Sequence, residues 1–155
     1  MIWSVFKAIK AIGLSRGFIR RHYSNYLSNN DIHSVETAVN DIQYKLHLSR
    51  NNTDRKIYTS SKRYDKTELD FLSYDRKSNP SIFIDIGANT GYYSLEMWKA
   101  GYDKVFSIEP HPETFSYLQK NIQMNQAESI IEAHRVCIGE TGRKHLSVGK
   151  DLGSC

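Results

Sequence analysis

The chain has 155 residues, of which 39% are hydrophobic and 25% are charged, and this suits a single globular domain. It has no apolar run of the ~20 residues that cross a bilayer. Two cysteines without Cys-x-x-Cys or metal-ligand spacing indicate neither a disulfide framework nor a metal site, and they favour a cytoplasmic protein.

The first 40 residues are predicted to form a basic amphipathic helical arm, separate from a domain at residues 41–155. Of the 21 basic residues, five lie in residues 1–30 with no acidic one, leaving 16 to face 17 acidic residues in the rest. Apolar residues from Ile2 to Leu14 recur at helical spacing around Lys7 and Lys10. Two interpretations remain open: the arm packs on protein, or residues 1–25 contact an anionic membrane peripherally. Five charges without a recognised module do not predict nucleic-acid binding.

Alternating strands and helices are predicted from residue 31 onwards. Such alternation is typical of an α/β fold, here a Rossmann-like parallel sheet with helices on both faces. Residues 55–61 fit a strand or a short helix equally well, after a loop at residues 49–54. The predicted helices are Asp31–Val39, Asp65–Tyr74, Tyr92–Lys99 and Pro112–Met124, and the predicted strands are Ile42–Leu48, Ile82–Ile86, Lys104–Ile108, Ser129–Val136 and Lys144–Val148.

A glycine turn between two acids carries the chemistry. Gly87 and Gly91 follow the strand that holds Asp85, and Asn89 stands where a dinucleotide site would have a further glycine. Glu109 ends the next strand, where a carboxylate can accept both ribose hydroxyls of an adenosine. Asp85 is predicted to hold a methionine ammonium or to order the loop. The pattern therefore favours S-adenosylmethionine over a nicotinamide dinucleotide.

Residues 83–95, 107–115 and 118–122, together with Val-Cys-Ile-Gly-Glu at 136–140, resemble the FkbM family of S-adenosylmethionine-dependent methyltransferases. The resemblance covers about residues 40–155. It implies S-adenosyl-L-methionine as cofactor, O-methyl transfer to a sugar or secondary-metabolite hydroxyl, and a small-molecule or glycan acceptor without nucleic acid. Ile138 would lie near the adenine. The predicted cofactor-binding residues are Asp85, Gly87, Ala88, Asn89, Gly91, Glu109, Pro110 and Ile138.

The sequence departs from that family at its end, because a further core strand with an Asp-x-Glu-Gly-like segment does not follow. We therefore expect residues 41–155 to be the N-terminal, cofactor-binding half of a class I methyltransferase domain, truncated at its C-terminus. No residue can be assigned as the catalytic base. The alternative function is a non-enzymatic binding fragment whose basic arm faces a membrane or a partner.

Overall fold

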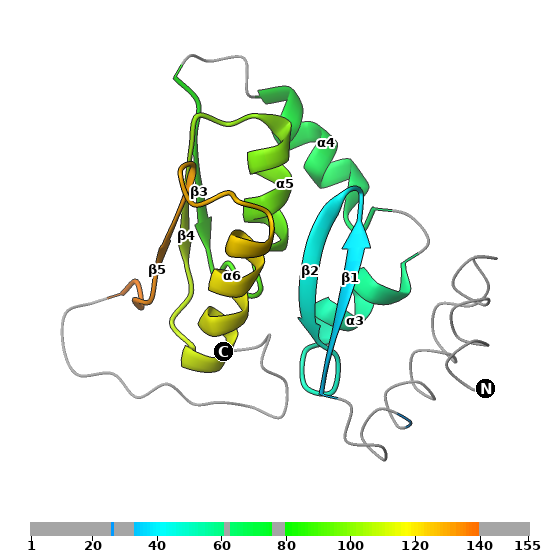
Figure 1. Cartoon of the computed structure of the whole chain (residues 1–155). Helices are drawn as coiled ribbons and strands as arrows, with labels where there is room; N and C mark the ends of the chain where they lie inside the picture. The colour runs from blue at the N-terminus through cyan, green and yellow to red at the C-terminus, as the bar shows by residue number, and fades with distance from the viewer. Residues whose placement is uncertain (1–25, 27–32, 61–62, 76–79, 140–155) are drawn as a thin grey trace.

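The computed structural model describes residues 26, 33–60, 63–75 and 80–139. Within them a parallel sheet and an antiparallel hairpin lie on opposite sides of a helix layer (Figure 1). The described helices include none that is long and apolar enough to cross a membrane. Residues 1–25 and the predicted strand Lys144–Val148 lie outside this part of the chain, so a helical arm within residues 1–25 remains a prediction. The expected boundary between residues 40 and 41 falls inside the antiparallel hairpin.

The hairpin replaces one of the predicted helices. Strand β1 (Ser34–Val39) pairs antiparallel with β2 (Ile42–His47), so the prediction of a helix from Asp31 to Val39 is wrong. Asn40 and Asp41 form the two-residue turn with φ angles of +53° and +58°. Turns of this kind need two left-handed residues, and Asn and Asp adopt that conformation more readily than most.

The parallel sheet has the order β3–β4–β5, formed by Ile82–Ile86, Lys104–Ile108 and Ile131–His134. The three strands run in the same direction, with Asp85 opposite Ser107 and Ile108 opposite His134. This confirms the predicted α/β class with a Rossmann-like parallel core. The third strand is shorter than predicted at both ends.

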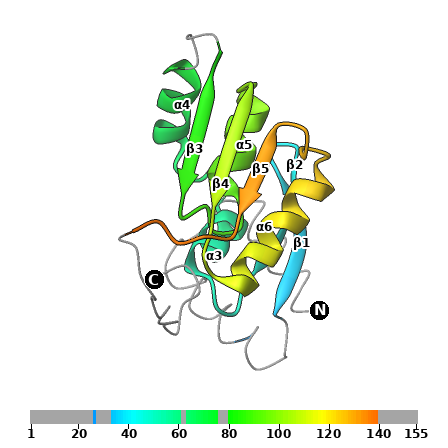
Figure 2. The ribbon, with the colours of Figure 1, turned by 90° about the vertical axis from the view of Figure 1, so that its left-hand side faces the viewer.

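Helices α5 (Tyr92–Ala100) and α6 (Pro112–Met124) form the layer between the sheet and the hairpin (Figures 1 and 2). They bury the face that carries Val105, Ser107 and Ile131. Residues of β3 alternate between the two faces, and on the other face Ile82, Ile84 and Ile86 are 56%, 58% and 66% exposed. The described helices α5 and α6 thus cover one face of the parallel sheet.

Asn121 of α6 and Asn125, which caps the end of this helix, attach the hairpin to the helix layer. Asn121 accepts the backbone N–H of Lys45 at 2.6 Å and donates to the carbonyl of Lys45 at 3.1 Å. Asn125 makes the same pair of contacts with Gln43, at 2.9 and 2.7 Å. Strand β2 therefore pairs with β1 along one edge, while part of its other edge is satisfied by amide side chains.

Two further helices connect β2 to the parallel sheet. The segment that fitted a strand or a helix equally well is helical and belongs to α3 (Asn52–Thr59). This helix begins inside the predicted loop, because Asn51 caps it by accepting the N–H of Asp54. Helix α4 (Lys66–Asp75) agrees with the predicted helix to within a residue at each end and packs against α5.

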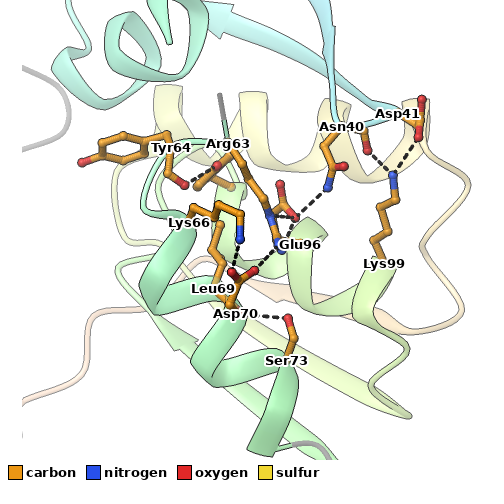
Figure 3. Close-up of polar contacts among 11 residues, drawn as sticks. Asn40, Asp41, Arg63, Tyr64, Lys66, Leu69, Asp70, Ser73, Glu96 and Lys99 are labelled. Carbon is orange, nitrogen blue, oxygen red and sulfur yellow. Dashed lines mark hydrogen bonds and ion pairs between the residues drawn. The ribbon is translucent and has the colours of Figure 1, made fainter. Parts of the chain in front are cut away.

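A buried ion pair fastens the segment before α4 to α5 (Figure 3). Arg63 donates from two nitrogens to Oε2 of Glu96, at 2.6 and 2.8 Å, and the Glu96 side chain is fully buried. The same oxygen accepts from Asn40 of the hairpin turn at 3.3 Å. One carboxylate of α5 therefore binds two segments that lie far apart in the sequence.

Candidate cofactor-binding site

The predicted glycine turn follows β3 directly and lies against the end of β4. The N–H groups of Gly87 and Ala88 both donate to the carbonyl of Ile108 at 2.9 Å. Gly87, Asn89 and Gly91 have φ angles of +79°, +53° and +90°, a conformation that glycine and asparagine accept most readily. The turn folds back sharply and starts α5 at the carboxyl ends of the parallel strands.

Gly91 is required for space as well as for its backbone angle. A Cβ at this position would lie 2.7 Å from the Cδ1 atom of Leu118, a fully buried residue of α6. Gly87 has no atom within 4 Å of the corresponding position. The close approach of Leu118 to the start of α5 therefore depends on the second glycine of the turn, whereas no neighbouring atom restricts the first.

Glu109 joins the two loops that border the site. Its Oε2 accepts the N–H of Asn89 at 2.9 Å, and its Oε1 accepts the N–H of His111 at 2.9 Å. The residue is only 5% exposed. Each carboxylate oxygen can accept about two hydrogen bonds, so each retains capacity for one more donor. The predicted ribose ligand is thus also the group that holds the glycine turn against the tip of β4.

Asp85 is held on the helix side of the sheet. Its Oδ2 accepts the hydroxyl of Ser94 in α5 at 2.6 Å, and Ser94 in turn accepts the hydroxyl of Ser107 at 2.7 Å. Burial raises the pKa of the Asp85 carboxyl, the Ser94 hydrogen bonds oppose this, and the charge of Glu109 adds to it. Asp85 and Glu109 lie at the carboxyl ends of the paired strands β3 and β4. A contact between Asp85 and the methionine ammonium remains a prediction.

The other predicted residues differ in their surroundings. Ala88 is buried in the turn, and Pro110 is half-buried beside Glu109. Ile138 is 57% exposed and follows β5, at the same end of the sheet. Its contact with an adenine remains a prediction. Among the described residues, no group of three or more His, Cys, Asp or Glu side chains is placed to hold a metal ion.

Four buried polar residues around the turn were not predicted from the sequence. Asn51, Asp54 and Asn121 contact the turn from outside the strand–turn–helix unit, and Thr90 lies within the turn. Asp54 accepts the hydroxyl of Thr90 at 2.6 Å, and Asn51 donates to the side-chain oxygen of Asn89 at 2.6 Å. Asn121 donates to the Thr90 carbonyl at 2.8 Å. The one available signal was the capping position of Asn51 before Asp54, since the contacts to the turn link residues 31, 36 and 38 positions apart.

A histidine at the end of β2 lies beside the start of α6. His47 Nε2 is 3.2 Å from Glu113 Oε1, and Arg50 approaches the other oxygen of Glu113 at 3.6 Å. Burial lowers the pKa of His47, while the charge of Glu113 opposes that shift. His111 caps α6, with its Nδ1 accepting the N–H of Thr114 at 3.3 Å. These contacts link the end of β2 to the start of α6.

Comparison with known proteins identifies the family to which this chain belongs. Residues 54–145 match the family model of the TRM5/TYW2 methyltransferase domain, which is more than half of the chain. The chain belongs to this family. A search of the curated proteins found no match. The TRM5/TYW2 assignment confirms a class I methyltransferase domain, but it corrects the expected family: the chain is not an FkbM protein.

Solved structures share the fold at low sequence identity. Pyrococcus horikoshii TYW2 in complex with MeSAdo is 22% identical with a TM-score of 0.51, over 75% of this chain and 46% of that protein. Trm5b from Pyrococcus abyssi is 19% identical with a TM-score of 0.50, over 65% and 27%. The aTrm5 protein in complex with tRNALeu is 18% identical with a TM-score of 0.50, over 64% and 27%. The chain thus spans less than half the length of each.

The expected acceptor must be corrected as well. A small-molecule or glycan acceptor without nucleic acid was predicted from the FkbM resemblance. The TRM5/TYW2 match removes that basis, and aTrm5, which shares the fold, was solved with tRNALeu bound. O-methyl transfer to a sugar or secondary-metabolite hydroxyl has no support in this family. The shared strand–turn–helix motif explains the error, because it serves the cofactor and says little about the acceptor.

Proposed function

We propose that this chain binds S-adenosylmethionine at the carboxyl ends of β3 and β4, as the cofactor-binding part of an RNA methyltransferase of the TRM5/TYW2 type. Three observations support the proposal: the match over residues 54–145, the geometry of the turn at Gly87–Gly91, and the bound MeSAdo of P. horikoshii TYW2, a protein of the same fold. Ligands of open α/β sheets lie outside the carboxyl ends of the strands.

The observation that carries the proposal is the position of Glu109. Its carboxylate is buried at the tip of β4 and is oriented by two backbone N–H groups, from Asn89 and His111. A carboxylate so fixed loses little conformational freedom when it binds a further donor. Its remaining acceptor capacity suits the two adjacent hydroxyls of a ribose, and Gly87 and Asn89 leave the turn without bulky side chains beside it.

We further propose a tRNA acceptor, in place of the small molecule expected from the sequence. The support is the family assignment and the tRNALeu complex of aTrm5. When bound, S-adenosylmethionine supplies an activated methyl group on its sulfonium. The residues described here bind and orient that cofactor. Much of the rate of a displacement comes from such positioning.

Calorimetric titration with S-adenosylhomocysteine tests the cofactor assignment. Glu109→Gln preserves the size of the side chain but replaces one acceptor oxygen with a donor. We expect the affinity to fall about 10- to 100-fold, the equivalent of a lost hydrogen bond to a charged group. Glu132→Gln is the matched control, because Glu132 lies in β5 and bonds to Lys104 and His134. Failure of the parent chain to bind, or equal binding by both variants, would contradict the assignment.

The acceptor class is tested by transfer of a labelled methyl group from S-adenosylmethionine in the presence of unmodified tRNA transcripts. Label in the RNA fraction, abolished by Glu109→Gln, is the expected result. Label in a glycan or a small hydroxyl compound, with none in RNA, would reject the tRNA proposal and leave the cofactor proposal intact.

A further inference from the structure

Asp54 is a buried acid that the cofactor chemistry does not use. It lies in the first turn of α3 and has no exposed surface. One of its oxygens accepts the hydroxyl of Thr90 at 2.6 Å, and the other accepts the backbone N–H of His47 at 2.7 Å. Burying a carboxylate is costly unless donors surround it, and here one of the donors comes from the glycine turn.

Asn51, one turn before Asp54, contacts the neighbouring residue of the same loop. It is 1% exposed, caps α3 with its side-chain oxygen, and uses its amide N–H to donate to Oδ1 of Asn89. Asn89 is the non-glycine residue of the turn with a positive φ, and its own N–H donates to Glu109. Helix α3 therefore contacts the turn through two consecutive residues, Asn89 and Thr90.

A third contact reaches the turn from the opposite direction. Asn121 of α6 donates to the carbonyl of Thr90 while it also holds both backbone groups of Lys45. Thr90 is thus held at its hydroxyl by α3 and at its carbonyl by α6. A left-handed backbone conformation is maintained where several contacts from the surrounding structure hold it in place. Gly87, Asn89 and Gly91 all have this conformation.

We infer that Asp54 is a positioning residue for cofactor binding, acting through the Thr90 hydroxyl to hold the glycine turn in its binding conformation. This inference rests on the proposed function, because it assigns α3 to the site that binds S-adenosylmethionine. Asp54 does not touch the cofactor in this role. It keeps Thr90, and with it Asn89 and the start of α5, at the distance from Glu109 that the ligand needs.

The binding test removes either end of the Asp54–Thr90 contact. Asp54→Asn and Thr90→Val are each expected to weaken S-adenosylhomocysteine binding about tenfold, the loss of one hydrogen bond to a charged group. Thr90→Ser keeps the hydroxyl and should bind like the parent. The Asp54→Asn, Thr90→Val double variant should be little weaker than either single variant, because both remove the same contact.

The matched control is Asp41→Asn in the hairpin turn, whose side chain is 96% exposed, and this variant should bind like the parent. A second readout needs no ligand. Hydrogen exchange of the amides of residues 88–92 should be faster in Asp54→Asn and Thr90→Val, while exchange in β4 stays unchanged. Thr90→Ser should restore protection.

The outcomes separate the inference from the proposed function. A parent chain that does not bind S-adenosylhomocysteine contradicts the proposed function, and hydrogen exchange then decides whether Asp54 orders the turn. A parent that binds, with Thr90→Val equal to Thr90→Ser in both affinity and exchange, overturns the inference alone. If Asp54→Asn does not fold, the two Thr90 variants carry the same decision.

Discussion

The two acids predicted from the sequence to face a ligand both have partners within the protein. Glu109 accepts two backbone N–H groups, and Asp85 accepts the hydroxyl of Ser94. Burial is the largest influence on Asp85 and raises its pKa, so the ionised form carries a cost in the folded protein.

The stability of an Asp85→Asn variant should reveal that cost. A raised pKa means that the folded state binds a proton more tightly than the unfolded state, whose pKa is near 3.8. The destabilising contribution is therefore absent below about pH 3.8 and grows as the pH rises through the folded pKa. Asparagine can still accept from Ser94 without a charge. We expect the variant to melt at a higher temperature than the parent at neutral pH.

Thermal melts recorded from acidic to neutral pH provide the measurement. The difference between variant and parent should shrink to nothing towards the acidic end. A difference that is independent of pH, or a variant that is less stable at neutral pH, would show that the Asp85 charge is not destabilising. Ser94→Ala is the control for loss of the hydrogen bond alone.

Among the elements, α5 connects the cofactor turn to the rest of the molecule. Its first residue follows Gly91, and its fifth, Glu96, binds Arg63 before α4 and Asn40 of the hairpin (Figure 3). Lys99, one turn further on, donates to the carbonyl of Asn40 and lies 3.2 Å from Asp41. The C-terminal half of the helix is thereby anchored, while its N-terminal end directly follows the glycine turn.

Removing one partner of the buried Arg63–Glu96 pair should lower the free energy of unfolding much more than removing both partners. Arg63→Met leaves the Glu96 carboxylate buried with its charge uncompensated, and we expect a loss of about 3–5 kcal/mol in the free energy of unfolding. Arg63→Met combined with Glu96→Leu should recover most of that loss, because the pair is replaced by apolar contacts of similar volume. Urea unfolding of the four proteins gives the coupling energy. Losses that simply add would contradict the pairing of Arg63 with Glu96.

At the scale of the whole molecule, the described helices α5 and α6 divide the parallel sheet into two unlike faces. The side against them buries Val105 and Ile131 completely or nearly so. The other side exposes the three isoleucines of β3. Across β4 and β5 it carries Lys104, which pairs with Glu132 at 3.2 Å, and His134, which lies 3.0 Å from the same carboxylate. The apolar part of this face continues from β3 onto β4, where Phe106 and Ile108 lie opposite Ile84 and Ile86.

Matched threonine substitutions on the two faces should behave differently. Ile84→Thr keeps the β-branch at a position that is 58% exposed, so we expect a change in stability within about 0.5 kcal/mol and weaker binding of an apolar fluorescent dye. Val105→Thr places a hydroxyl in the core and should cost about 1–3 kcal/mol. Equal losses of stability from both substitutions would show that the β3 face is buried in solution.

The sequence was sufficient to predict the elements whose apolar pattern is local. Strands β3 and β4 and helix α6 have the predicted limits, because apolar spacing, Pro112 and the glycine turn all lie within a few residues of the features they determine. Strand β1 was missed because its short mixed sequence reads equally well as a helix. The Asn40–Asp41 pair, whose two residues both adopt positive φ angles, is the local feature that favours a hairpin here.

The contacts that hold the site together were beyond local reasoning. Asp54 meets Thr90 across 36 residues, and Asn121 meets Lys45 across 76, so no spacing rule connects them. The expectation of the FkbM family was wrong for a related physical reason. The pattern of Gly87, Gly91 and Glu109 predicts a nucleoside cofactor and carries no information on the acceptor.

The hydrogen bonds between Asn121 of α6 and Lys45 of β2 have a consequence for folding during translation. Lys45 and Asn121 are separated by 76 residues, so a ribosome adding about 5–20 residues per second takes about 4–15 s between them. A two-stranded hairpin is marginally stable on its own. During translation, the β1–β2 hairpin is therefore synthesised before the asparagine side chains that bond to the edge of β2. It is fully stabilised only after α6 has left the exit tunnel.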